Sequence, residues 1–270
     1  MNEPMTPGGL ATGKRDIDIW LTYYDEIVDT RQLAELRTLL NPEEVGKEGR
    51  FLFADDRKRY LVTRAMVRML LSRYAPVEPE RWEFSRNAYG RPGIANAMDE
   101  TRGLIFNISH TRGLIALAVT RGRELGVDVE NVVARNTSID IAERYFSPVE
   151  VAELSCVPAE RQQDRFFEYW TFKEAYIKAR GMGLSLPLDR FSFDFPHHGA
   201  VRISIQPDLD DHAERWSFWQ CRPTADYVMA ICAERGAGVS PGISMRKFNP
   251  LVSETPLAPE FLKTSDFRMV

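Results

Sequence analysis

The chain has 270 residues, of which 44% are hydrophobic and 27% are charged, a composition typical of a soluble globular protein. Its formal net charge of -4 gives no support for a nucleic-acid coat, so we expect no nucleic-acid partner. Three irregularly spaced cysteines predict neither a disulfide framework nor a zinc site, and they fit a reducing cytoplasm. No apolar run is long enough to span a membrane, so we expect no membrane partner.

The chain begins with a lead and then a predicted α+β segment. Residues 1–14 are rich in Pro, Gly and Thr and lack an apolar core, so we expect a flexible lead rather than a signal peptide. Apolar and polar residues alternate over 17–23, which predicts a strand. The run Asn-Pro-Glu-Glu at 41–44 predicts a helix start, because it supplies a capping side chain, a first-position proline and first-turn acids.

Further along the chain, short apolar stretches between glycine and proline turns predict strands, and longer unbroken stretches predict helices. We expect a basic helix over 55–74 and a second long helix over 163–180, which ends before Gly181. The expected strands cover 106–109, 114–120, 126–130, 191–195, 201–205, 216–221 and 227–233. This mixture of elements predicts an α+β fold.

The chain also contains a faint internal repeat. The strand–turn–strand segment 106–122 resembles 218–236, and each ends in Arg-Gly. We therefore expect two similar α+β halves, an N-terminal half over 15–120 and a C-terminal half over 121–236. Residues 237–270 show little periodicity, so we expect an extension that wraps the surface or is partly disordered.

Two stretches place charged side chains where they could meet. In a strand over 126–130, Asp128 and Glu130 point to one side and the valines point to the other. In a helix, residues four apart share a face, so Glu174 and Lys178 lie on one stripe. If this helix packs on this strand, three carboxylates and one ammonium meet at one place.

A cation would offset the repulsion between such carboxylates, which is roughly 4 kcal/mol for a pair about 4 Å apart at an effective dielectric of about 20. Neither stretch holds His or Cys, so the oxygen ligands predict Mg²⁺, or Mn²⁺ in its place, rather than zinc. Lys178 would then meet phosphate charge. The alternative is a solvated strand face beside an ordinary helical Glu-Lys pair.

Four motifs, in this order along the chain, resemble a known enzyme family. They are Tyr-Gly-Arg-Pro at 89–92, Phe-Asn-Ile-Ser-His at 106–110, Gly-Val-Asp-Val-Glu at 126–130 and Trp-x-x-Lys-Glu-Ala-x-x-Lys at 170–178. The combination resembles the 4'-phosphopantetheinyl transferase superfamily, and the chain length resembles its larger, surfactin-type members. The resemblance covers about 41–195. It implies a pseudo-twofold monomer with its active site in the cleft between the halves.

The resemblance also implies a reaction and its partners. Coenzyme A would be the substrate, and an apo acyl or peptidyl carrier protein would be the acceptor. The 4'-phosphopantetheine arm would pass to a carrier serine in a Mg²⁺-dependent step that releases 3',5'-ADP. Two alternatives remain: a non-catalytic module that binds coenzyme A or carrier proteins, and a Mg²⁺-dependent nucleotide phosphohydrolase.

Roles for single residues follow from the same resemblance. Asp128, Glu130 and Glu174 would hold the metal, and Glu174, Lys178 and His110 would be catalytic. The residues implied to bind coenzyme A are Lys47, Arg59, Arg91, Pro92, Ser109, His110 and Lys178.

Three acids leave questions open. Glu174 is either the general base or only a metal ligand. Glu44 stands where relatives carry a lysine, and an acid there would repel the 3'-phosphate of coenzyme A. Glu150 is either a further acid of the site or a first-turn acid that serves the helix dipole.

Overall fold

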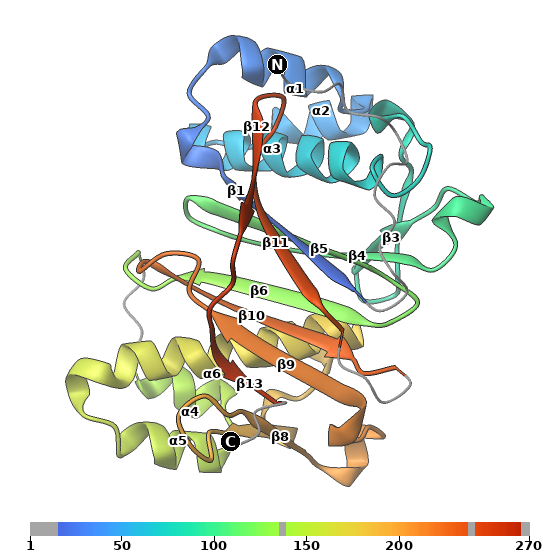
Figure 1. The fold of residues 1–270 in the computed structure, drawn as a ribbon. Coiled ribbons are helices and arrows are strands. Elements are labelled where there is room, and N and C mark those ends of the chain that lie inside the picture. Colours follow the sequence, from blue (N-terminus) through green and yellow to red (C-terminus); the bar gives the residue numbers. More distant parts are fainter. Residues whose placement is uncertain (1–15, 135–138, 237–240, 266–270) are drawn as a thin grey trace.

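The computed structural model describes residues 16–134, 139–236 and 241–265. The expected N-terminal lead, 1–14, lies outside the described residues. Two β-sheets lie next to each other in the middle of the molecule, and helices cover the outer side of each (Figure 1). The prediction of an α+β fold built from two similar halves is confirmed.

The N-terminal half is built on a five-stranded sheet with the order β12-β11-β1-β5-β4. Strand β1 pairs in parallel with β11 and antiparallel with β5. The strands are β1 (Ile17–Tyr23), β4 (Leu104–Thr111), β5 (Leu114–Arg121), β11 (Ile243–Asn249) and β12 (Ser253–Leu257). The helices of this half are α1 (Thr30–Thr38), α2 (Pro42–Glu48) and α3 (Ala54–Leu71). A small hairpin of β2 (Phe84–Arg86) and β3 (Pro92–Ile94) stands beside the sheet.

The C-terminal half is built on a four-stranded sheet with the order β13-β9-β10-β6. Its strands are β6 (Leu125–Asn131), β9 (Trp216–Cys221), β10 (Tyr227–Glu234) and β13 (Phe261–Thr264). Its helices are α4 (Ile139–Tyr145), α5 (Pro148–Ser155) and α6 (Ala159–Arg180). A second hairpin joins β7 (Phe191–Asp194) to β8 (Arg202–Ile205). Helix α6 begins about one turn earlier than the sequence pattern predicts.

Matching local signals begin a helix in each half. Asn41 starts α2 with a capping box, because its side chain accepts from the Glu44 amide and the Glu44 carboxylate accepts from the Asn41 amide. Ser147 starts α5 in the same way with Glu150. Both helix starts therefore follow from the residues at those positions, and the first confirms the prediction at 41–44.

Three apolar cores hold the layers together. One lies between the first sheet and α1–α3, and a second lies between the other sheet and α4–α6. The third joins the two sheets to each other, and Val127 and Val129 belong to it. The predicted alternation of β6 is therefore confirmed, since its valines face this core. Of the helices in the described part of the chain, none is both long enough and apolar enough to cross a lipid bilayer.

The C-terminal segment contains strands that were not predicted. Residues 237–270 were expected to wrap the surface or to be partly disordered, and within this range residues 243–264 form three strands that pair with both sheets. In Figure 1 this red segment runs from β12 in one half down to β13 in the other. Strand β12 is an exposed edge strand that carries Pro256, so its sequence lacks the apolar alternation that reveals a half-buried strand. Residues 237–240 and 266–270 of the expected extension lie outside the described part.

Candidate active site

The two halves meet along strands β4 and β6, and side chains join these strands. Strand β6 pairs with β10 on one side only, so its other amides need partners from outside its sheet. Alternate side chains of β4 accept from them. The three contacts are Val127 N to Asn107 Oδ1 (3.0 Å), Val129 N to Ser109 Oγ (3.3 Å) and Asn131 N to Thr111 Oγ1 (3.2 Å). The polar motif at 107–111 therefore joins the two halves.

Helix α6 packs unusually close to β6, and Gly126 permits this. A Cβ added at Gly126 would lie 2.0 Å from the Ala175 carbonyl oxygen and 2.5 Å from the Ala179 nitrogen. Only a residue without a side chain fits at such a distance. The close approach brings Glu174 and Lys178, on α6, next to Asp128 on β6.

Lys178 is the centre of the charge cluster. Its Nζ donates to Asp128 Oδ1 at 2.7 Å, to Ser109 Oγ at 2.8 Å and to the Val127 carbonyl oxygen at 3.1 Å. Ser109 Oγ also donates to Asp128 Oδ1 at 2.9 Å. Three elements, α6, β4 and β6, therefore place their polar groups at one point between the halves.

Glu174 lies partly buried beside this cluster. Burial raises the pKa of its carboxyl group most, the negative charge of Asp128 adds to the rise and Lys178 opposes it, and together these effects place the pKa at about 7. His110 lies at the end of the same motif. Loss of hydration lowers the pKa of its imidazole, and the positive charges of Arg59 and Lys178 add to that effect. Glu174 is therefore poised to exchange a proton near neutral pH, whereas the environment of His110 favours its neutral imidazole.

The donor set fits a hard divalent cation. Asp128 Oδ2 is buried and has no hydrogen-bond partner, and Glu174 is a second carboxyl group whose ionised form burial disfavours. A cation would satisfy both. Glu130, two residues beyond Asp128, has Thr111 Oγ1 at 3.3 Å from its Oε2. Within the described ranges, no three His, Cys, Asp or Glu side chains stand together as a formed metal site, so the three-acid set stays a prediction.

A pocket of about 280 Å³ opens between the halves next to these charges. The tip of the β2–β3 hairpin and β4 form one wall, and the last turns of α6 form the other. Its lining residues are Tyr89, Gly90, Arg91, Pro92, Asn107, Ile108, Glu174, Ile177, Lys178, Gly181 and Gly183. Two predicted catalytic residues, Glu174 and Lys178, therefore face the same cavity as the predicted ligand residues Arg91 and Pro92.

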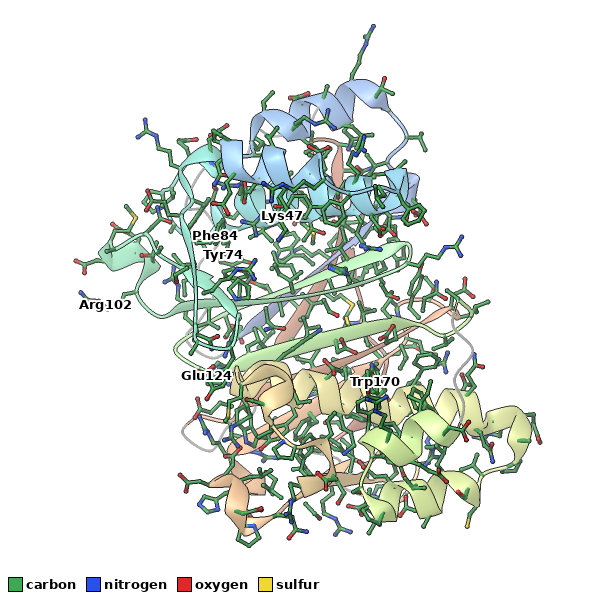
Figure 2. The ribbon with its side chains drawn as sticks, turned by 180° about the vertical axis from the view of Figure 1, so that it is seen from behind. Lys47, Tyr74, Phe84, Arg102, Glu124 and Trp170 are labelled. Atoms are coloured by element: carbon green, nitrogen blue, oxygen red, sulfur yellow. The ribbon has the colours of Figure 1, made fainter. Side chains whose placement is uncertain are left out.

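A smaller charged pocket of about 150 Å³ lies beyond Pro92, in the N-terminal half, and its lining includes two acids, Glu43 and Glu44. Lys47, which was predicted to bind coenzyme A, lines it together with Arg64 and Arg86. Figure 2 shows Lys47 and Phe84 in this half, with Trp170 in the other. Arg64 and Arg86 were not predicted from the sequence as site residues. Arg64 stands one helical turn after Tyr60, another lining residue, but the structure alone identifies Tyr60 as part of the pocket.

Glu44 does not present a free negative charge to this pocket. It is 6% exposed, caps its own helix, and forms ion pairs with Arg64 and Arg68. The expected repulsion of a phosphate is therefore largely neutralised. Arg59, another predicted ligand residue, is not among the lining residues of this pocket. It forms a 2.6 Å ion pair with Asp56, and its positive charge helps to lower the pKa of His110.

Glu150 serves the structure of its own half. It is fully buried, and its carboxylate accepts from the Phe193 amide at 2.9 Å. It also forms a 2.7 Å ion pair with Lys173, which is itself fully buried and donates to two backbone carbonyl groups. The helix-start reading of Glu150 therefore agrees with its contacts, and Lys173 is its partner.

Comparison with known proteins decides the family. Residues 124–232 match the sequence model of the 4'-phosphopantetheinyl transferase superfamily, and residues 29–121 match a model described as 4'-phosphopantetheinyl transferase, N-terminal. The chain belongs to the 4'-phosphopantetheinyl transferase superfamily. The boundary between the two matched segments falls close to the predicted one between the halves.

The sequences of several named members of the superfamily align with most of this transferase. The 4'-phosphopantetheinyl transferase HetI of Nostoc sp. is 34% identical over 235 residues, which are 87% of this chain and 94% of the relative. The 4'-phosphopantetheinyl transferase Sfp of Bacillus subtilis is 32% identical over 216 residues, 80% of this chain and 91% of the relative. A Mus musculus relative, L-aminoadipate-semialdehyde dehydrogenase-phosphopantetheinyl transferase, is 27% identical over 82% of this chain and 80% of its own.

Proposed function

We propose that this transferase moves the 4'-phosphopantetheine arm of coenzyme A onto a serine of an apo acyl or peptidyl carrier protein, depends on Mg²⁺ and releases 3',5'-ADP. The observation that carries the proposal is the cavity between the halves, where Glu174 and Lys178 face Arg91 and Pro92 across the space. A second pocket continues from Pro92 toward Lys47, and its three basic residues face two acids, Glu43 and Glu44. A nucleotide with several phosphates fits an elongated site with basic side chains along it.

Different residues of the chain would bind the phosphates of coenzyme A and stabilise the charge that develops during transfer. Lys178 would leave Asp128 for the pyrophosphate of coenzyme A, where its ammonium stabilises the charge that develops on the phosphate oxygens. His110 would donate a hydrogen bond to the same phosphates, beside Ser109. Lys47, with Arg59 near His110, would attract the phosphates at the nucleotide end.

Glu174 is the group best suited to accept the proton of the carrier serine. Its pKa of about 7 in the metal-free protein matches a base that works near neutral pH, whereas Mg²⁺ on the same carboxylate would lower this pKa and make Glu174 a metal ligand only. Asp128, Glu130 and Glu174 would hold Mg²⁺. When bound, this ion would neutralise the pyrophosphate and polarise its oxygens. Positioning of the serine against the phosphorus then supplies much of the acceleration, as in other phosphoryl-type transfers.

The proposal is tested by weighing the acceptor. Purified protein is incubated with coenzyme A, Mg²⁺ and an apo carrier protein, and the carrier is measured by intact mass spectrometry. We expect a carrier heavier by one phosphopantetheine and an equal amount of 3',5'-ADP. The Lys178→Ala variant should lose roughly 100-fold or more of the rate, since it removes a donor to the developing charge.

Two other outcomes would each contradict the proposal. Release of phosphate or cleavage of coenzyme A with an unchanged carrier would indicate a phosphohydrolase. Binding of coenzyme A without any product would indicate a non-catalytic module. Repeating the reaction with excess chelator tests the metal, and full activity there would reject Mg²⁺ dependence.

A further inference from the structure

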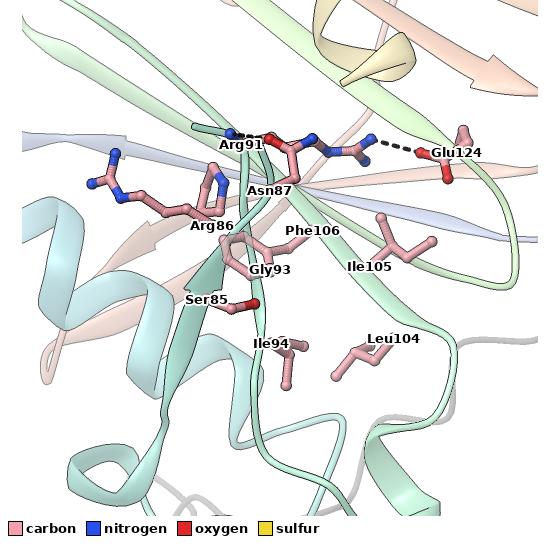
Figure 3. A pocket seen from close by; sticks show the side chains of 11 residues that line it. Ser85, Arg86, Asn87, Arg91, Gly93, Ile94, Leu104, Ile105, Phe106 and Glu124 are labelled. Carbon is pink, nitrogen blue, oxygen red and sulfur yellow. Dashed lines mark hydrogen bonds and ion pairs between the residues drawn. The ribbon is translucent and has the colours of Figure 1, made fainter. Parts of the chain in front are cut away.

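The tip of the β2–β3 hairpin reaches across from the N-terminal half and binds the C-terminal half. Arg91 NH1 donates to Glu124 Oε2 at 2.6 Å and to the Ala179 carbonyl oxygen at 3.0 Å, and Arg91 NH2 donates to the Leu125 carbonyl oxygen at 3.3 Å. Figure 3 shows the Arg91 side chain extended toward Glu124, with Asn87 beside it. Glu124 lies where the two halves meet in Figure 2.

Asn87 makes a second contact from the same hairpin. Its Nδ2 donates to the Gly181 carbonyl oxygen at 2.7 Å, while its Oδ1 accepts from the amides of Tyr89 and Arg91 and so shapes the turn. One side chain therefore both forms the hairpin tip and attaches it to the other half. We call Asn87, Arg91 and Glu124, with their contacts to Ala179 and Gly181, the hairpin contact.

The hairpin contact completes the end of α6. The last carbonyl groups of a helix lack partners within the helix, and basic side chains there also interact favourably with the helix dipole. The Ala179 and Gly181 carbonyls obtain their donors from Arg91 and Asn87. Gly181 ends α6 with a positive φ of 65°, and a Cβ at that position would lie 2.9 Å from Arg91 NH1. Glycine at position 181 therefore leaves the space in which the Arg91 guanidinium lies against the end of α6.

The position of the hairpin contact relates it to the pocket. Tyr89, Gly90 and Pro92 belong to the hairpin tip and line one wall, whereas Glu174 and Lys178 lie in the last two turns of α6 and line the other. The contact therefore fixes the distance between the two walls. A loose hairpin would have to be ordered each time a ligand bound, and this ordering would weaken binding.

We propose that Asn87, Arg91 and Glu124 are positioning residues, which hold the hairpin wall of the pocket at a fixed place relative to α6. The proposal rests on coenzyme A occupying this pocket. It gives Arg91 a role different from that of a phosphate ligand. The guanidinium uses its NH1 and NH2 groups for Glu124, Ala179 and Leu125, and the side chain is 16% exposed.

The Glu124→Gln variant separates the two roles of Arg91 because they predict opposite signs. If Arg91 positions the hairpin, loss of the Glu124 charge loosens the wall, and KM for coenzyme A should rise roughly fivefold with kcat within about twofold. If Arg91 binds phosphate, removal of a competing acid should lower KM. An unchanged or lowered KM would therefore overturn the proposal.

Asn87→Asp provides an independent variant. It keeps the acceptor that shapes the turn but removes the donor to Gly181, so KM for coenzyme A should rise again. Asp164→Asn is the matched control, since it removes a 2.9 Å ion pair with Arg222 at the other end of α6. The control should leave KM unchanged, and all three variants should unfold within about 3 °C of the parent.

A measurement that needs no enzymatic reaction tests the positioning role even if the protein transfers nothing. Amide hydrogen exchange of the full chain, free of ligand, should become faster over 87–92 and at the end of α6 in Glu124→Gln and Asn87→Asp, but not in Asp164→Asn. Equal exchange in all variants would overturn the positioning role. Absence of transfer by the parent protein would count against the proposed function alone.

Discussion

Glu174 shows how a single carboxyl group links the site to stability. Its pKa lies at about 7 in the folded chain, against an ordinary value of 4.5, because burial and then Asp128 disfavour its charge. The folded state therefore holds more protons than the unfolded state between these two values. Its contribution to stability is complete below about pH 4.5 and is lost as the pH rises to about 7.

This difference predicts a pH-dependent effect of Glu174→Gln in protein kept free of divalent ions by a chelator. At pH 8 the variant should be more stable than the parent by roughly 2–3 kcal/mol, and the advantage should disappear toward pH 4.5. Urea unfolding at several pH values measures it. Added Mg²⁺ should stabilise only the parent at pH 8. Parallel stability curves for parent and variant would contradict the assignment of the raised pKa.

Other residue roles could be read from the sequence only in part. Strand alternation correctly predicted that Asp128 and Glu130 leave the apolar core, and the four-residue spacing brought Glu174 and Lys178 to one pocket. The partners of Glu44 and Glu150 could not be predicted. Arg64 and Arg68 lie on a different helix from Glu44, and Lys173 reaches Glu150 only through the packing of α6 on α5.

At the scale of elements, the packing of α6 on β6 depends on a single missing side chain. Gly126→Ala would place a methyl group within 2.0 Å of the Ala175 carbonyl oxygen, so the helix must move outward. We expect a loss of stability of about 1–3 kcal/mol and a loss of transfer activity, because Glu174 and Lys178 move with α6. Thermal unfolding and the carrier mass assay measure the two effects.

Gly46→Ala is the matched control for this change. Gly46 lies exposed in α2, and an added Cβ would meet nothing within 4 Å. The substitution should leave activity unchanged and raise stability by up to about 1 kcal/mol, since alanine favours the helix. If Gly126→Ala behaved like Gly46→Ala, the close approach of α6 and β6 would not matter for the site.

Element boundaries followed the sequence wherever a local signal existed. Asn41 and Ser147 mark the starts of α2 and α5, and Gly181 marks the end of α6. The strands β11 and β13 were missed because each pairs with a strand outside its own sequence window: β11 with β1, and β13 with β9. Such non-local pairing leaves no trace in a short sequence window.

At the scale of the whole molecule, the segment that carries β12 and β13 belongs to both halves. Removal of residues 250–270 would take β12 from β11 and β13 from β9, and it would also remove the Arg73–Glu254 and Lys263–Glu168 ion pairs. We expect a lower unfolding temperature and self-association through the exposed strand edges. Calorimetry and light scattering measure these effects, and a truncated chain that stays monomeric with unchanged stability would contradict them.

The pairing of β11 with β1 also sets the order in which the protein can be completed. A ribosome makes β11 long after β1, so the N-terminal sheet cannot be completed until residues 243–249 have been made. Strand β9 waits in the same way for β13. Neither sheet is therefore complete until these late strands have been made. A nascent chain that stalls before residue 243 still exposes an edge of each sheet to chaperones.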